Sequence, residues 1–138
     1  MIVDDEASIR LICSINFTAS GWDATEAIDG EEALQRIPLE KPDVLLLDVM
    51  MPGADGWTVA ERLAADPATR DVPVLFLSAR AEQRDRERAH ALGAVAYLTK
   101  PIDPVRLPEI AEEILRRLER GERDALRAEV LDDRRNTL

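Results

Sequence analysis

The chain is poor in cysteine and in positive charge. Cys13 is its one cysteine, so no disulfide can form within the chain, and a reducing, cytoplasmic location is the simplest expectation. Lysine and arginine together number 18 against 28 acidic residues, which gives a formal net charge of -10. This balance argues against binding to nucleic acid, which needs a basic surface, and favours a partner that is a cation or is locally basic.

Long apolar stretches are also missing. No run approaches the roughly 20 residues that cross a bilayer, and the N-terminus lacks the basic start and apolar segment of a signal peptide. Insertion into a membrane is therefore not expected. The composition is nevertheless 46% hydrophobic over 138 residues, which is typical of one folded domain with a real core.

What the chain does have is an alternation of short apolar runs and helical patterns. Strands are expected at 1–3, 22–27, 44–47, 74–77 and 94–98. Helices are expected at about 7–20, 31–37, 57–65 and 81–92, and then from either Pro104 or Pro108 to about 118. Pro38 is expected to close the second helix. Continuous apolar strands separated by helices predict an α/β fold with a parallel sheet covered on both faces.

Two helical segments have less regular patterns. The first helix should turn Ile9, Ile12 and Cys13 towards the core, although Asn16 and Ser20 interrupt that face. Residues 119–138 are mostly charged, with a thin apolar stripe. That tail is either frayed and disordered or a short extra helix that packs back or meets a partner. We therefore predict a domain over 1–120 and a charged tail over 121–138.

Polar side chains follow the apolar strands at the points where they end. Asp4 and Asp5 follow the first strand, and Asp48 follows the third. Ser78 follows the fourth strand and Lys100 the fifth. The carboxyl ends of parallel strands meet at one edge of a sheet, where ligands bind. Three carboxylates, one hydroxyl and one ammonium group should therefore converge there.

This set of groups favours chemistry on a phosphoryl group. Three close carboxylates repel one another unless a cation lies among them, and Mg²⁺ prefers such oxygen ligands. Lys100 and Ser78 would then be available to bind phosphoryl oxygens. A carboxylate between metal and lysine can attack phosphorus and form an acyl phosphate. Taken singly, each residue has a duller explanation as a helix cap, a turn residue or a solvated lysine.

Four segments, in the order "VDDE", "LLLDVMMPGADGW", "LFLSA" and "YLTKP", resemble the receiver domain of two-component response regulators over about residues 1–118. The resemblance implies a doubly wound, flavodoxin-like fold whose five strands have the order 2-1-3-4-5. It implies that Asp48 accepts a phosphoryl group from a phosphohistidine of a sensor histidine kinase or histidine phosphotransferase. Asp4, Asp5, Asp48 and the main-chain oxygen of Met50 would bind Mg²⁺.

The same resemblance implies a switch. Lys100 would bind the phosphoryl group, the Ser78 hydroxyl would be drawn towards it, and Tyr97 would turn inward into the vacated space. The surface of the fourth helix, fifth strand and fifth helix would change as a result, and a downstream effector protein or a second copy would bind there. From sequence alone, Tyr97 could equally be a half-buried aromatic of the strand.

Two departures and two rivals accompany this interpretation. The first strand is short, and no output domain follows, which points to a stand-alone regulator or an isolated receiver. One rival is an aspartyl-phosphate phosphatase, but such enzymes carry a second Asp two residues after the nucleophile, where this chain has Met50. The other rival is a receiver fold kept only for binding. We expect a phosphoacceptor that is not an enzyme.

Overall fold

The computed structural model describes residues 1–80 and 82–132 of the chain. Five parallel strands form one sheet in the order β2-β1-β3-β4-β5. In chain order the elements are β1 (Ile2–Val3), α1 (Ala7–Ala19), β2 (Glu26–Ala27), α2 (Gly30–Glu40), β3 (Leu45–Asp48), α3 (Gly56–Ala65), β4 (Val74–Ser78), α4 (Gln83–Ala91), β5 (Ala96–Thr99), α5 (Leu107–Glu119) and α6 (Arg123–Glu129). The predicted α/β fold and strand order are confirmed.

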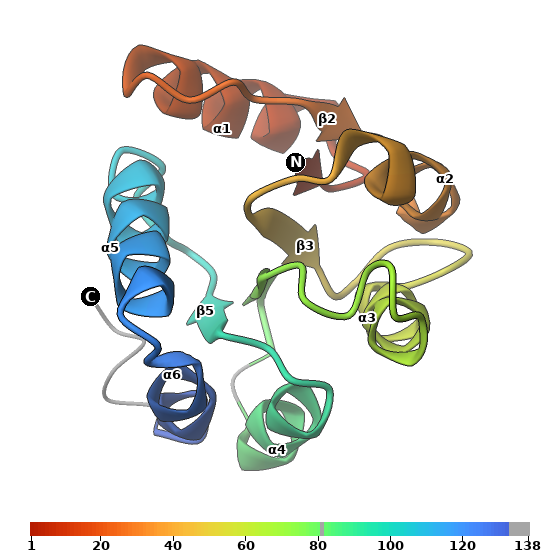
Figure 1. The fold of residues 1–138 in the computed structure, drawn as a ribbon. Coiled ribbons are helices and arrows are strands. Elements are labelled where there is room, and N and C mark those ends of the chain that lie inside the picture. Colours follow the sequence, from red (N-terminus) through yellow and green to blue (C-terminus); the bar gives the residue numbers. More distant parts are fainter. Residues whose placement is uncertain (81, 133–138) are drawn as a thin grey trace.

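Helices cover both faces of the sheet. α1 and α5 lie on one face, α2, α3 and α4 lie on the other, and α6 lies beyond the β5 end (Figure 1). Every residue of β3 and β4 is buried, which explains why these strands are unbroken apolar runs. The two faces form two apolar cores, one containing Phe76 and Trp57 and the other Leu98 and Ile114.

Three sequence-based boundaries or faces were wrong. The second strand is only Glu26–Ala27, because Trp22 leaves the expected strand to pack edge-on against Phe17, with ring centroids 5.4 Å apart. The second helix does not end at Pro38 but continues to Glu40. On α1, Ile12 is 47% exposed, and the buried residues are Cys13 and Phe17, four apart.

The continuation of α2 through Pro38 has a local cause. Pro38 is exposed, so the carbonyl that loses its N–H partner can bond to water. Arg36 pairs with Glu32 at 2.7 Å and with Glu40 at 2.5 Å, and the second of these ion pairs spans the proline. Lys41 then ends the helix in the left-handed conformation, at φ 48°.

The C-terminal part of the chain resolves two open expectations. α5 begins at Leu107 with Pro108 in its first turn, so the later of the two predicted starts is the one observed. Within the charged tail, Arg123–Glu129 is helical, and Leu126 and Val130 are buried. Residues 133–138 lie outside the described part. Among the described residues, every helix is too short or too polar to traverse a lipid bilayer.

Candidate functional site

The carboxyl edge of the sheet gathers the acidic residues that follow the strands. Carboxylate oxygens of Asp4, Asp5 and Asp48 all lie within 4.8 Å of one another. The Lys100 ammonium nitrogen lies 3.6 Å from an oxygen of Asp4 and 3.6 Å from an oxygen of Asp48. Three acids from two strand ends and one cation from a third therefore meet in one place.

The local sequence fixes the first acidic pair. Asp4 is 2% exposed, and its carboxylate accepts a hydrogen bond from the Glu6 N–H at 2.9 Å. The Arg10 guanidinium donates to the Asp4 carbonyl at 2.7 Å and pairs with Glu26 of β2 at 3.4 Å. Although β1 has only two residues, it pairs with both β2 and β3. Asp4 is thus held in place by contacts with α1 as well as by the strand.

Asp48 ends the buried run of β3, and the following loop bends back close to it. The Met50 N–H donates to the Asp48 carboxylate at 3.2 Å. The Gly56 N–H donates to the Val49 carbonyl at 3.0 Å, which brings the start of α3 against the end of β3. A Cβ at Gly56 would lie 2.4 Å from the Asp48 carbonyl oxygen, so no other residue fits this close approach. The Asp-Gly of the sequence is therefore a packing requirement for holding Asp48.

Electrostatics at this edge favour a bound cation. Asp48 is 4% exposed, and burial together with the neighbouring Asp4 raises its pKa to about 6, although Lys100 opposes this. A carboxyl group with a raised pKa is one whose charge is poorly stabilised. A hard divalent cation among the three carboxylates would remove that penalty, and an oxygen-rich donor set is what Mg²⁺ prefers.

Ser78 and Tyr97 are linked through the backbone of Arg80. Ser78 is fully buried, and its hydroxyl oxygen accepts from the Arg80 N–H at 3.0 Å. The Tyr97 hydroxyl donates to the Arg80 carbonyl at 2.8 Å. The Lys100–Pro101 peptide bond that follows β5 is cis.

Tyr97 lies inward in this structure. Its ring is already fully buried, at 0% exposure, and it stacks on Trp57 with centroids 6.4 Å apart. The Arg86 guanidinium lies 5.2 Å from the Tyr97 ring centroid. These contacts, together with the hydroxyl bond to Arg80, already place the ring in the inward position. The rotation of Tyr97 on phosphorylation stays a prediction.

Sequence reasoning missed two neighbours of the site. Trp57 of α3 is 3% exposed, and the Arg88 guanidinium lies 4.9 Å from its ring centroid. Arg86 of α4 is 2% exposed, although the charged pattern of that helix indicates a solvated face. The only signal in the sequence was the apolar position of Trp57 on its helix, which does not tell a core residue from a site residue.

Cys13 lies on α1 in an environment that suppresses its reactivity. Its side chain is 2% exposed, and burial, reinforced by Asp4, raises the pKa of the thiol to about 11. Because the thiolate is the reactive form, we expect negligible reaction of the folded protein with an aqueous disulfide reagent at pH 8. One equivalent should react in about 8 M urea, where the chain is unfolded and the thiol is exposed. Rapid labelling of the folded protein would contradict the buried placement.

The sequence of the chain matches a known protein family. The family model described as response regulator receiver domain matches residues 1–112. The chain belongs to this family. Receiver domains are the phosphorylation-activated switches of two-component signalling, and they act with histidine kinases and with effectors.

Individual relatives agree with this assignment. The receiver domain is 36% identical over 132 residues to the DNA-binding dual master transcriptional regulator RpaA of Synechocystis, covering 96% of this chain and 55% of the relative. It is 41% identical over 119 residues to the alkaline phosphatase synthesis transcriptional regulatory protein PhoP of Bacillus subtilis, covering 86% of this chain and 49% of the relative. The chain thus spans about half the length of these two curated relatives.

Solved structures show the same fold. A putative response regulator from Chloroflexus aurantiacus superposes with a TM-score of 0.77 at 35% identity, covering 84% of this receiver domain and 95% of that chain. The Vibrio cholerae chemotaxis protein CheY4 gives a TM-score of 0.77 at 28% identity, covering 82% of this chain and 94% of that one.

Proposed function

We propose that this receiver domain is a Mg²⁺-dependent phosphoacceptor whose acceptor is the Asp48 carboxylate. The observation that carries the proposal is the convergence of three carboxylates within 4.8 Å, with the Lys100 ammonium 3.6 Å from Asp48. Asp4, Asp5 and Asp48 would hold Mg²⁺, with the main-chain oxygen of Met50 as a further ligand. When bound, the ion would offset the negative charge of the carboxylates and of the incoming phosphoryl oxygens.

The transfer itself is a displacement at phosphorus. An oxygen of the ionised Asp48 attacks the phosphorus of a phosphohistidine, the P–N bond breaks, and the imidazole leaves with the electron pair and takes up a proton. The product is an acyl phosphate on Asp48. Lys100 would pair with one phosphoryl oxygen. The Ser78 hydroxyl, which accepts from the Arg80 N–H and also bonds to the Tyr97 hydroxyl, would turn its O–H towards another phosphoryl oxygen.

The surface beside the site suits a protein donor. α1 exposes Leu11, Ile12 and Ile15, each between 47% and 57% exposed, next to the edge where Asp4 lies. We propose that the phosphohistidine protein docks against these side chains in the cytoplasm, and that an effector protein reads the phosphorylated state. We also propose that the unit 1–120 carries the phosphoacceptor and that 121–138 is a charged C-terminal tail.

An aspartyl-phosphate phosphatase is the less supported alternative. Such an enzyme needs an acid/base group two residues after the nucleophile, and here that residue is Met50, whose side chain cannot exchange a proton. We therefore propose that the chain accepts a phosphoryl group without turning over a phosphate ester.

Intact-mass measurement after incubation with phosphoramidate tests the proposal. We expect one phosphoryl group on the wild type with Mg²⁺ present, and none after removal of divalent ions with EDTA. Asp48→Asn should remain unmodified, whereas Asp43→Asn, at an exposed carboxylate five residues earlier, should be modified like the wild type. An unmodified wild type, or an adduct that persists in Asp48→Asn, would overturn the proposal.

A further inference from the structure

The C-terminal helix α6 covers part of the surface formed by α4, β5 and α5 (Figure 1). The Arg127 carbonyl lies 2.8 Å from Nδ1 of His90, near the end of α4. The Leu131 carbonyl accepts from the Gln83 side chain, at the start of α4, at 3.3 Å. The segment from Arg127 to Leu131 therefore runs along the length of α4. Because β5 is the end strand of the sheet, α6 also lies beside its otherwise open edge.

Two apolar residues and one ion pair hold α6 in place. Leu126 and Val130, four residues apart, are 4% and 1% exposed. Leu126 belongs to the core that contains Leu98, and Val130 to the core that contains Tyr97. Glu129 accepts two hydrogen bonds from the Arg117 guanidinium of α5, at 2.6 and 2.9 Å. This is the pattern by which an amphipathic helix binds a groove: spaced apolar anchors and one charged contact.

The docked position of α6 lies beside a buried charge. Arg86 is 2% exposed, and in the described part of the chain Nε and Nη1 of its guanidinium have no hydrogen-bond partner. Arg86 lies three residues after Gln83 and four before His90, so it is on the side of α4 that faces α6. Its guanidinium lies 5.2 Å from the Tyr97 ring centroid, so the charge has an aromatic partner, but the two unsatisfied nitrogens make its burial unfavourable.

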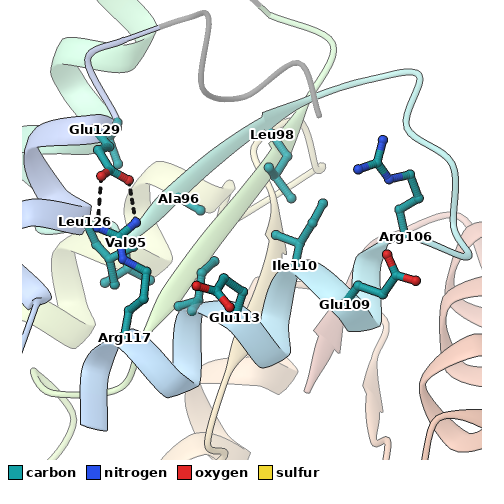
Figure 2. A pocket seen from close by; sticks show the side chains of 12 residues that line it. Val95, Ala96, Leu98, Arg106, Glu109, Ile110, Glu113, Arg117, Leu126 and Glu129 are labelled. Carbon is teal, nitrogen blue, oxygen red and sulfur yellow. Dashed lines mark hydrogen bonds and ion pairs between the residues drawn. The ribbon is translucent and has the colours of Figure 1, made fainter. Parts of the chain in front are cut away.

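The rest of the same surface is an open groove. A pocket of about 380 Å³ lies between α5 and β5, with Ala96 and Leu98 along the strand and Ile110 on the helix. Figure 2 shows that Leu126 and Glu129 of α6 stand at one end of this pocket, where the carboxylate of Glu129 meets Arg117. The groove is therefore continuous with the place that α6 occupies.

We propose that α6 is a displaceable intramolecular ligand of a helix-binding groove, and that an amphipathic helix of a partner protein binds there by taking its place. The partner helix would carry the features that α6 uses: two apolar residues four apart, with an acidic residue directly before the second to meet Arg117. While α6 is docked, Val130 packs in the core that holds Tyr97 inward. The signalling role of the exchange rests on the proposed function, whereas the exchange itself needs no phosphorylation.

A peptide with the sequence of residues 120–132, carrying a fluorophore, tests the groove directly by fluorescence anisotropy. The receptor is the full chain with Leu126→Asp and Val130→Asp, in which the tethered helix can no longer dock. We expect this variant to bind the peptide on the order of 10²-fold more tightly than the wild type, where the tethered α6 competes at a high effective concentration. A peptide with Glu129→Arg should bind the variant at least about 10-fold more weakly, because it repels Arg117.

A third substitution in the receptor tests the ion pair, and circular dichroism checks that the receptor variant is folded. Adding Arg117→Glu to the double variant should reverse the preference, so that the Glu129→Arg peptide binds better than the native peptide. If the double variant is unfolded by circular dichroism, full-length Glu129→Arg replaces it. This variant keeps Leu126 and Val130 but turns the ion pair with Arg117 into a repulsion, so it should still bind the native peptide more tightly than the wild type does. Equal binding by wild type and folded variant, or binding by neither, would overturn the proposal.

The phosphoacceptor proposal and the groove proposal can be contradicted independently of each other. The peptide measurements are made without a phosphodonor, and the phosphoryl adduct is measured by intact mass on the same proteins. A variant that binds the peptide but takes no phosphoryl group retains the groove and contradicts only the phosphoacceptor function. A wild type found by sizing to be a dimer with exchanged α6 helices would assign the groove to a second copy and overturn the role of a partner helix.

Discussion

Gly56→Ala is expected to lower the free energy of unfolding by about 1–3 kcal/mol, the range seen when an atom is forced into a packed interior. The new Cβ would lie 2.4 Å from the Asp48 carbonyl oxygen and 2.8 Å from the Val49 Cα. Both are backbone atoms, so the start of α3 and the end of β3 would have to separate. Because Asp48 ends β3, the variant should also take up a phosphoryl group more slowly. Urea denaturation and the time course of the phosphoryl adduct measure the two effects.

Gly30→Ala is the matched control for that variant. Its Cβ would lie 2.3 Å from the Ala54 carbonyl oxygen and 2.8 Å from a methyl carbon of Val59, so the overlap is of the same size. The clash is with the loop and with α3 rather than with Asp48 itself. We expect a comparable loss of stability with a smaller effect on phosphorylation. Equal unfolding midpoints for Gly56→Ala and the wild type would show that the close approach is not rigid.

Asp48→Asn is expected to stabilise the metal-free protein by about 1–2 kcal/mol at pH 7.5, since a shift of one pKa unit corresponds to about 1.4 kcal/mol. The pKa of Asp48 is raised from 3.8 to about 6, chiefly by burial and by Asp4. Between these values the folded state binds more protons than the unfolded state, so the wild type loses stability as the pH rises through this window. Above pH 6 the full penalty is present, and an uncharged side chain removes it. Lys100 keeps Asp4 as an ion-pair partner in the variant.

Thermal unfolding with and without Mg²⁺ measures this effect and its reversal. Below about pH 3 the wild type and Asp48→Asn should have similar stability, because Asp48 is then protonated in both states. Saturating Mg²⁺ should raise the melting temperature of the wild type more than that of the variant, since it binds the folded state through the carboxylates. An Asp48→Asn protein that is less stable than the wild type at pH 7.5 without divalent ions would show that Asp48 is not destabilising when ionised.

The sheet and its edge were predictable because their signals are local. The unbroken apolar runs before Asp48 and before Ser78 define two central strands and state where each one ends. Once the strands are parallel, their ends meet, and the acidic residues and Lys100 come together without further information. Boundaries were less predictable. Pro38 sits inside a helix because of an ion pair across it, which propensity alone does not register.

Contacts between residues that are distant in the sequence could not be predicted from the sequence. Arg86 reads as one of several solvated charges in α4, but it lies buried against the Tyr97 ring, on the side of the helix that faces α6. The orientation of Tyr97 likewise depends on Trp57, 40 residues earlier in the chain, and on the carbonyl of Arg80. Sequence patterns indicate which face of an element is apolar, but they do not indicate which of two packings a side chain at a boundary adopts.

The position of Trp57 makes it an intrinsic fluorescent probe of the region around Tyr97. Its indole is stacked on Tyr97, with Arg88 against its ring, whereas Trp22, the other tryptophan, packs on Phe17 at the α1 end of the fold. A Trp22→Phe protein would retain Trp57 as its single tryptophan, beside the ring of Tyr97. Changes in its fluorescence lifetime would then report rearrangement around Tyr97 in real time, with no attached label.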